Sequence, residues 1–257
     1  MEIVNRALYE EINLKVNKIK RNPQLFENRK KEVIKNLRDL GDIYSWWREN
    51  PGLRKSLLLG NKNPKTIQKE AIKGIHHIKN AWYYLTQKGR ETDFVEVLDE
   101  SILKKTNYLV EPEFDGTGDF RKRDVTLDIE GYTPSSWEKV PEKISKMILQ
   151  IKEHYRENPL ESALMAHFEI TRIQPFMEGN KRTGRLIQDR ILLDLGMPPV
   201  VINSGEGKFY FDLLKRILPH YDRHNSETFK QFYDYCASKI NNGLDSILND
   251  LDNISAR

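Results

Sequence analysis

The chain has a single cysteine, Cys236, among 257 residues. One thiol cannot form a disulfide framework or a zinc site of four cysteines. The count therefore excludes a disulfide-rich secreted protein and fits a reducing compartment. No apolar run approaches the roughly 18 residues of a membrane-spanning helix, and the first residues lack the basic-then-apolar layout of a secretory signal. These absences predict a cytoplasmic protein that does not partner with a membrane.

The net charge is also small. The 42 basic and 38 acidic side chains leave a formal charge of +4, too little to indicate nucleic-acid binding by itself. Nine basic residues lie between residues 15 and 38, and a solvated helical face explains them more simply than a contact with an anionic partner. Phe26 is the single aromatic residue among them, and the lack of interleaved stacking aromatics argues against nucleic acid as a partner.

What the chain does have is helical periodicity. Apolar residues recur at helical spacing, which predicts helices at 2–21, 25–48, 65–88, 92–106, 141–157, 159–173, 182–195, 208–218 and 226–248. With 38% hydrophobic residues the chain can bury a real core, and no internal repeat divides it. We therefore expect a mainly α protein with an N-terminal helical extension at 1–60, a main domain at 61–240 and a C-terminal helical tail at 241–257.

One stretch breaks this rhythm. Residues 115–134 begin and end with Gly, Asp and Pro turn signals. Between these signals Val125, Leu127 and Ile129 alternate with Thr126 and Asp128, which is the two-residue period of a strand. This pattern predicts a short β-hairpin or flap inserted in the helical body.

The chemistry is concentrated at residues 174–185. Pro175 and the pair Gly179-Asn180 interrupt the helical pattern, which resumes directly afterwards. Backbone N–H groups at such a helix N-terminus lack intrahelical partners and form a nest for anions. Three cations, Lys181, Arg182 and Arg185, would add full charges there, and Glu178 supplies a carboxylate of the kind that binds Mg²⁺ on phosphates.

This segment resembles the signature of the Fic/Doc (Fido) family, which is His-x-Phe-x-Asp/Glu-Gly-Asn-Gly/Lys-Arg-x-x-Arg. The matching positions are Phe176, Glu178, Gly179, Asn180, Arg182 and Arg185. Gly118 to Arg121 with Val125 to Leu127 is similar to the family's flap, and 209–214 resembles its downstream aromatic helix. The resemblance extends over roughly residues 50–235.

The resemblance implies a helical Fic-type bundle that moves AMP, or another phosphate-containing group, from ATP or another nucleotide to a hydroxyl of a target protein. It implies that Glu178 holds Mg²⁺, that His167 is packed rather than catalytic, and that Phe176 anchors the loop. The nucleotide would contact Phe176, Gly179, Asn180, Lys181, Arg182, Gly184 and Arg185. The target protein would dock as an added strand on the flap at 115–134, at Phe120, Arg121, Val125 and Leu127.

The main departure from the family pattern is Gln174, which stands where the family has its catalytic histidine. A carboxamide has no usable pKa near neutrality and cannot act as the general base, which typically contributes about 10²–10⁴-fold in rate. Two interpretations stay open: a transferase with an impaired base, or an inactive nucleotide-binding pseudoenzyme that recognises a partner through the flap. Whether Gln174 is natural or engineered also stays open.

Two further departures concern the transferred group and regulation. Lys181 stands where AMP-transferring members most often have Gly, so it either alters the phosphate nest or points outward. Residues 54–61 end in Gly60-Asn61, like the family's inhibitory helix, but Leu59 replaces the glutamate that would pair with Arg185. A plain helix C-terminus explains the segment equally well. A homo-oligomer is a further open alternative.

Overall fold

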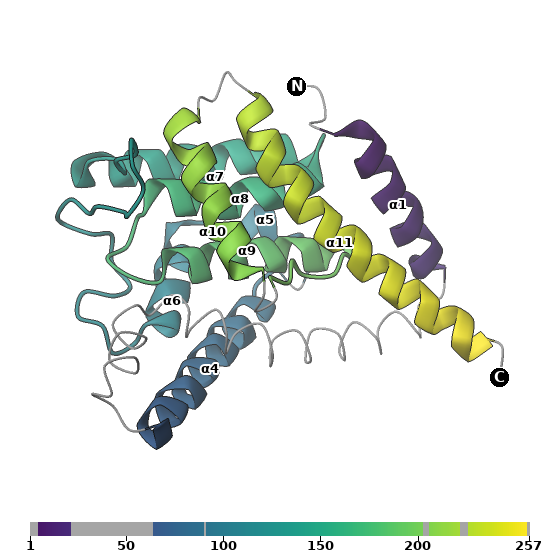
Figure 1. Ribbon diagram of the computed structural model, residues 1–257, viewed down its shortest axis with the longest axis horizontal. Coiled ribbons are helices and arrows are strands. Elements are labelled where there is room, and N and C mark those ends of the chain that lie inside the picture. The colour runs from purple at the N-terminus through teal and green to yellow at the C-terminus, as the bar shows by residue number, and fades with distance from the viewer. Residues whose placement is uncertain (1–4, 22–63, 90, 203–205, 222–225, 256–257) are drawn as a thin grey trace.

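The computed structural model describes residues 5–21, 64–89, 91–202, 206–221 and 226–255 (Figure 1). Within these ranges the regular structure is helical, which confirms the mainly α fold predicted from the sequence. The helices are α1 (Arg6–Lys20), α4 (Pro64–Thr86), α5 (Phe94–Val97), α6 (Glu100–Val110), α7 (Val140–Tyr155), α8 (Pro159–Ile173), α9 (Asn180–Leu195), α10 (Gly207–Ile217) and α11 (Ser226–Ser255), with short 3-10 turns at Trp137–Lys139 and Leu218–His220. The predictions at 25–48 and 54–61 lie outside the described residues.

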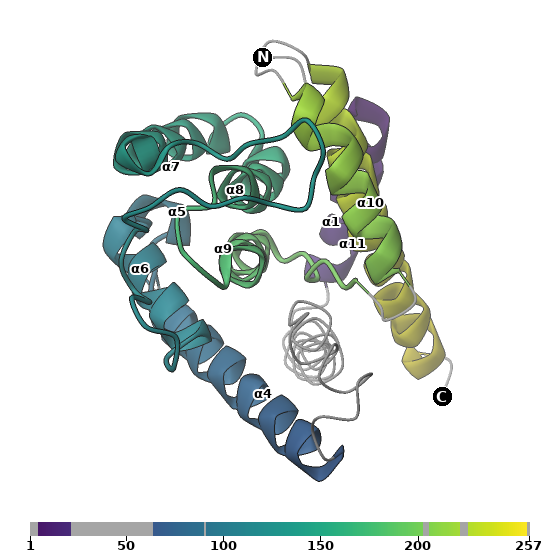
Figure 2. The same ribbon diagram turned by 60° about the vertical axis from the view of Figure 1, so that its left-hand side comes forward.

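Helix α8 runs through the centre of the molecule. Figure 2 shows α8 and α9 side by side, with α6 and α7 on one side and α10 and α11 on the other. Leu160, Leu164 and Phe168 of α8 are completely buried, and the Phe168 ring makes edge or tilted contacts with Phe229 and Phe232 of α11. Because α8 is covered on most sides, its C-terminus and the loop that follows are held in a rigid setting.

The boundaries of α8 and α9 follow from local residue chemistry. Pro159 starts α8 at a position where its missing N–H costs nothing. The helix ends at Ile173 because Gln174 is left-handed and Pro175 follows it. Helix α9 ends at Gly196, also left-handed, where the Met197 N–H donates to the Leu192 carbonyl at 2.9 Å. The two helices that flank the signature loop are therefore delimited by the sequence itself.

The prediction of one continuous helix at 92–106 is wrong, because this segment forms two separate helices, α5 and α6. Leu98 is extended between them, and Asp99 caps α6 by accepting from the Ile102 N–H at 2.8 Å. Periodicity alone could not find this break, since the apolar residues on either side keep helical spacing.

We expect Asp99→Ala to lower the free energy of unfolding by about 1 kcal/mol, because the cap on α6 is lost. Urea denaturation measures the change. The exposed Glu91→Ala is the control and should stay within about 0.5 kcal/mol of the parent protein. Equal unfolding midpoints for Asp99→Ala and the parent would contradict the capping role.

The β-hairpin predicted at 115–134 is also wrong, because this described segment forms no strand. Its alternation is nevertheless real, since Val125, Leu127 and Ile129 are half-buried or buried while Thr126 and Asp128 are exposed. Between Gly118 and Gly131, which both have positive φ, the described backbone forms no regular element and pairs with no second strand. We call residues 115–134 the flap.

Helices α1 and α11 pack against each other at the edge of the bundle (Figure 1). Lys15 of α1 forms ion pairs with Glu11 of its own helix and with Asp245 of α11. Lys15, one of the basic residues of 15–38, therefore contacts the protein itself. Helix α11 continues without a break past residue 241 to Ser255. Across the described residues, no helix has the length and the apolar character needed to cross a membrane.

Candidate functional site

Gln174 lies at the end of α8 in the left-handed region, with φ 52° and ψ 60°. It is the one described non-glycine residue with positive φ, and this conformation costs about 1 kcal/mol or more for such a residue. Its side chain is buried: Nε2 donates to the Thr171 carbonyl at 2.5 Å, and Oε1 accepts from Asn180 Nδ2 at 2.9 Å. The Gln174 carboxamide is thus held in one orientation.

Asn180, the first residue of α9, ties the loop together. Its Oδ1 accepts from the Phe176 N–H at 2.8 Å, and its Nδ2 donates to the Phe176 carbonyl at 2.8 Å as well as to Gln174. Both amide hydrogens are therefore used inside the loop, and the side chain has none left for a phosphate in this conformation. Phe176 is buried, as expected of the residue that anchors the loop.

The N-terminus of α9 presents backbone amides. Gly179 precedes the helix with φ 77°, and no side chain caps it. The amides of Gly179 and Asn180 donate to no group in the described part of the chain. A Cβ at Gly179 would come within 3.0 Å of Asn107 Nδ2 and Glu111 Cγ, so α6 packs directly against this turn. Both the backbone conformation and the packing therefore require glycine here.

The three cations of the loop lie in different surroundings. The Arg182 guanidinium forms an ion pair with Glu111, which follows α6, and only 8% of its side chain is exposed. Half-buried Arg185 donates through Nε to the Lys181 carbonyl at 3.3 Å. Lys181 Nζ lies 5.7 Å from the centre of the Phe211 ring on α10. In this conformation the Lys181 ammonium therefore lies near an aromatic ring of α10.

Asp189 lies one turn after Arg185 on α9. Its Oδ1 accepts from Gln188 Nε2 at 3.1 Å and from the Val200 N–H at 3.2 Å. Burial raises the pKa of Asp189 to about 7, although these hydrogen bonds and the charge of Arg185 lower it. The Arg185 charge thus favours the ionised form of this buried carboxyl.

Two residues of this site, Asn107 and Glu111, were missed by the sequence reasoning. Asn107 is completely buried on α6; its Nδ2 donates to the Glu178 carbonyl at 2.8 Å, and its Oδ1 accepts from the Gly118 N–H of the flap at 3.3 Å. A signal was present, because Asn107 occupies one position of the helical face formed by Leu103, Thr106, Asn107 and Val110. A polar residue on an otherwise buried face calls for a buried hydrogen-bond partner.

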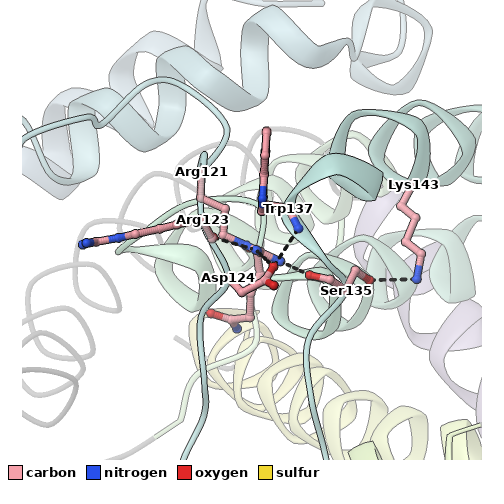
Figure 3. A network of polar contacts seen from close by, with 7 residues as sticks. Arg121, Arg123, Asp124, Ser135, Trp137 and Lys143 are labelled. Carbon is pink, nitrogen blue, oxygen red and sulfur yellow. Dashed lines mark hydrogen bonds and ion pairs between the residues drawn. The ribbon is translucent and has the colours of Figure 1, made fainter.

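Arg121 connects the flap to the signature loop (Figure 3). Its N–H donates to the Pro175 carbonyl at 2.9 Å, and its Nε donates to the Gln174 carbonyl at 2.7 Å. Its side chain is fully buried, so its guanidinium is not exposed at the surface where a target protein was expected to dock. Phe120 packs on Phe176 with ring centres 5.8 Å apart. Both flap residues therefore stabilise the contact with the loop.

Gly184, which was expected to contact the nucleotide, packs closely against α8. A Cβ at this position would lie 3.1 Å from the carbonyl oxygen of His167. His167 is completely buried, with its two ring nitrogens at hydrogen-bond distance from Gln188 Oε1 and the Tyr210 hydroxyl. This confirms that His167 is packed and that no catalytic imidazole is available from it. Gly184 allows close approach of α8 and α9.

Glu178 is exposed at the mouth of the loop, while its carbonyl is held by Asn107. Within the described ranges, no group of three or more His, Cys, Asp or Glu side chains could hold a metal ion. The described residues therefore do not form a metal site made of protein ligands alone. A single carboxylate beside an anion nest is instead the donor set that Mg²⁺ uses when phosphate oxygens supply the remaining ligands.

Comparisons with known proteins agree with this geometry. The model of the Fic/DOC family matches residues 97–192, which include α6, the flap, the signature loop and most of α9. The protein adenylyltransferase Fic of Aedes aegypti is 37% identical over 67 residues, which cover 26% of this chain and 13% of that protein. The matched region is therefore a small part of that relative's length.

Solved structures share the fold. A Fic domain containing signaling protein from Bacteroides thetaiotaomicron superposes with a TM-score of 0.69 at 19% identity, covering 89% of this chain and 94% of that one. IbpAFic2, solved in complex with adenylylated Cdc42, superposes with a TM-score of 0.52 at 20% identity, covering 82% and 70%. Residues 97–192 of this chain therefore match the Fic/DOC family in sequence, and the chain shares the fold of solved Fic-domain structures.

Proposed function

We propose that this chain binds a nucleoside triphosphate at residues 178–185 and transfers AMP from it to a hydroxyl side chain of a target protein. The observation that carries the proposal is the loop geometry: the hydrogen bonds of Asn180 hold residues 174–180, and the amides of Gly179 and Asn180 at the start of α9 donate to no group in the described part of the chain. The name of the Aedes relative, a protein adenylyltransferase, supports AMP as the transferred group.

Within this proposal the residues of the loop have distinct roles. The amides of Gly179 and Asn180 bind phosphate oxygens, and Arg185 adds a full charge one turn further along α9. Glu178 would hold Mg²⁺, whose charge offsets the negative charge of the phosphates. Arg182 contributes less charge than the signature implies, because Glu111 neutralises it.

The flap provides the surface for the target protein. Thr126 and Asp128 are exposed, and the backbone amides of Val125 and Thr126 donate to no group in the described part of the chain. A segment with unbonded amides and one solvent-facing side can accept a partner strand. The complex of IbpAFic2 with adenylylated Cdc42 supports a protein as the acceptor.

A second candidate function is nucleotide binding without transfer, and Gln174 favours it. Both polar atoms of this side chain are engaged, with the Thr171 carbonyl and with Asn180, and neither can take a proton from an acceptor hydroxyl near neutral pH. In this case the protein would recognise its partner through the flap while the loop holds an unreacted nucleotide.

Labelled ATP distinguishes the two functions. The chain and its Gln174→His variant are incubated in lysate with Mg²⁺ and with ATP labelled at either the α- or the γ-phosphate. Transfer of AMP places the α-label on a protein band, whereas transfer of phosphate places only the γ-label there. If neither protein transfers either label while ATP still binds, the result supports the second function, nucleotide binding without transfer.

Binding itself depends on Arg185. Saturation with a ligand at about 100 times its Kd adds about 2.7 kcal/mol of stability, which corresponds to about 5–10 °C in Tm for a domain of this size. We expect MgATP to produce such a shift for the chain, and Arg185→Ala to abolish most of it. The exposed Arg156→Ala serves as the control and should keep the shift. A full shift in Arg185→Ala would mean that phosphates bind elsewhere.

A further inference from the structure

The strained conformation of Gln174 is held by partners from three parts of the chain. Its N–H donates to the Ile170 carbonyl of α8 at 3.1 Å, and its side chain is bonded to Thr171 and Asn180. Its carbonyl accepts from Arg121 Nε. Helices α8 and α9 supply the other bonds, so Arg121 is the flap's contribution to the geometry of position 174.

The same guanidinium also holds the flap (Figure 3). Nη1 donates to the Arg123 carbonyl at 2.9 Å and lies 3.4 Å from Asp124 Oδ1, while Nη2 donates to the Ser135 carbonyl. The Trp137 N–H adds a bond to Asp124 Oδ1 at 2.9 Å. The two ends of segment 123–135 are thus attached to one planar group.

Because the Arg121 guanidinium is buried, its hydrogen bonds to the flap and to Gln174 are kept or lost together. Burial lowers the pKa of Arg121, and the nearby Asp124 carboxylate opposes that effect. Three of the four acceptors of the Arg121 guanidinium are main-chain carbonyls. The fourth, the Asp124 carboxylate, is largely exposed and screened by water, so it compensates little of the buried charge. A buried guanidinium that loses some of its acceptors must follow the remaining ones into a new position, since unsatisfied donors are costly.

We propose that Arg121 is a positioning residue that couples the flap to position 174. When the flap moves, the guanidinium moves with the carbonyls of Arg123 and Ser135 and releases the carbonyl of Gln174, so that position 174 leaves its strained conformation. Docking of a protein on the flap therefore acts on the site where the acceptor hydroxyl must lose its proton. The catalytic part of this statement rests on the proposed transferase function, whereas the coupling of flap and loop does not.

The coupling is tested without any ligand by amide hydrogen exchange, comparing the chain with Arg121→Lys. Lysine keeps the charge but cannot reach several carbonyls in one plane. The variant should speed exchange of the Gln174 and Phe176 amides by about tenfold or more, because local opening of the loop becomes easier. Unchanged exchange at these two amides would overturn the proposal.

Arg190→Lys is a matched control. Arg190 is a buried arginine on α9 that also donates to main-chain carbonyls, those of Leu85 and Lys88, and pairs with a carboxylate, Asp194. Its replacement should destabilise the protein to a similar degree while leaving exchange at Gln174 and Phe176 within about twofold of the parent after correction for global stability. An equal local effect from Arg190→Lys would show that the response is general loosening and would overturn the coupling.

Activity provides the second test, in proteins that carry Gln174→His. Adding Arg121→Lys should lower kcat by about tenfold or more and leave the KM for MgATP within about twofold, because the phosphate-binding groups of α9 are untouched. A rise in KM with kcat unchanged would overturn the positioning role. If Gln174→His transfers no label at all, the proposed function fails, and the exchange experiment alone decides the coupling.

Discussion

Gln174→His is expected to raise the rate of AMP transfer by about 10²–10⁴-fold, the usual contribution of a positioned general base. The loop that would present the imidazole is already formed, since Asn180 and Arg121 hold position 174 from both sides. The amides of Gly179 and Asn180 and the charge of Arg185 are also in place. Only the group that accepts the proton is missing, so one substitution should supply it.

The rate of α-label incorporation into protein bands measures this effect, between about pH 5.5 and pH 8. A histidine base is active when neutral, so the rate of Gln174→His should rise with pH through an apparent pKa near the ordinary value of about 6.5. Gln174→Asn retains a carboxamide and should remain as slow as the parent. If Gln174→His is no faster than Gln174→Asn although MgATP stabilises both, position 174 does not carry the base.

Asn180→Ala is expected to lower the free energy of unfolding by about 3 kcal/mol. The substitution leaves the N–H and the carbonyl of Phe176 and the Gln174 carboxamide without partners in a buried loop, and each such group costs about 1–3 kcal/mol, part of which water recovers. Denaturant unfolding followed by circular dichroism gives the change. The stabilisation by MgATP should fall as well, because the amides before α9 lose their fixed positions.

Asn241→Ala is the control for this prediction. Asn241 donates one exposed hydrogen bond to Glu11, and its loss should change stability by less than about 0.5 kcal/mol. Equal stability of Asn180→Ala and Asn241→Ala would mean that the bonds around Asn180 do not determine the loop.

Much of the backbone could be predicted from the sequence. The ends of α8 and α9 follow from Pro159, Pro175, Gly179 and Gly196, whose effects on φ and on hydrogen bonding act within a few residues. The flap shows the limit of such patterns. Its alternation correctly identified which side chains turn inward, but a strand also needs a hydrogen-bonded partner, and the described residues supply none.

The sequence by itself determined the mainly helical fold and the position of the loop at 174–185, because each depends on residue type and spacing along the chain. Only the tertiary structure decided that Glu111 neutralises Arg182, that Asn107 holds the Glu178 carbonyl, and that Arg121 turns inward to hold the carbonyl of Gln174. These partners lie between 53 and 71 residues apart in the sequence. Burial requires every charged and polar group to find a partner, and which partner it finds depends on how distant helices pack, which residue patterns do not encode.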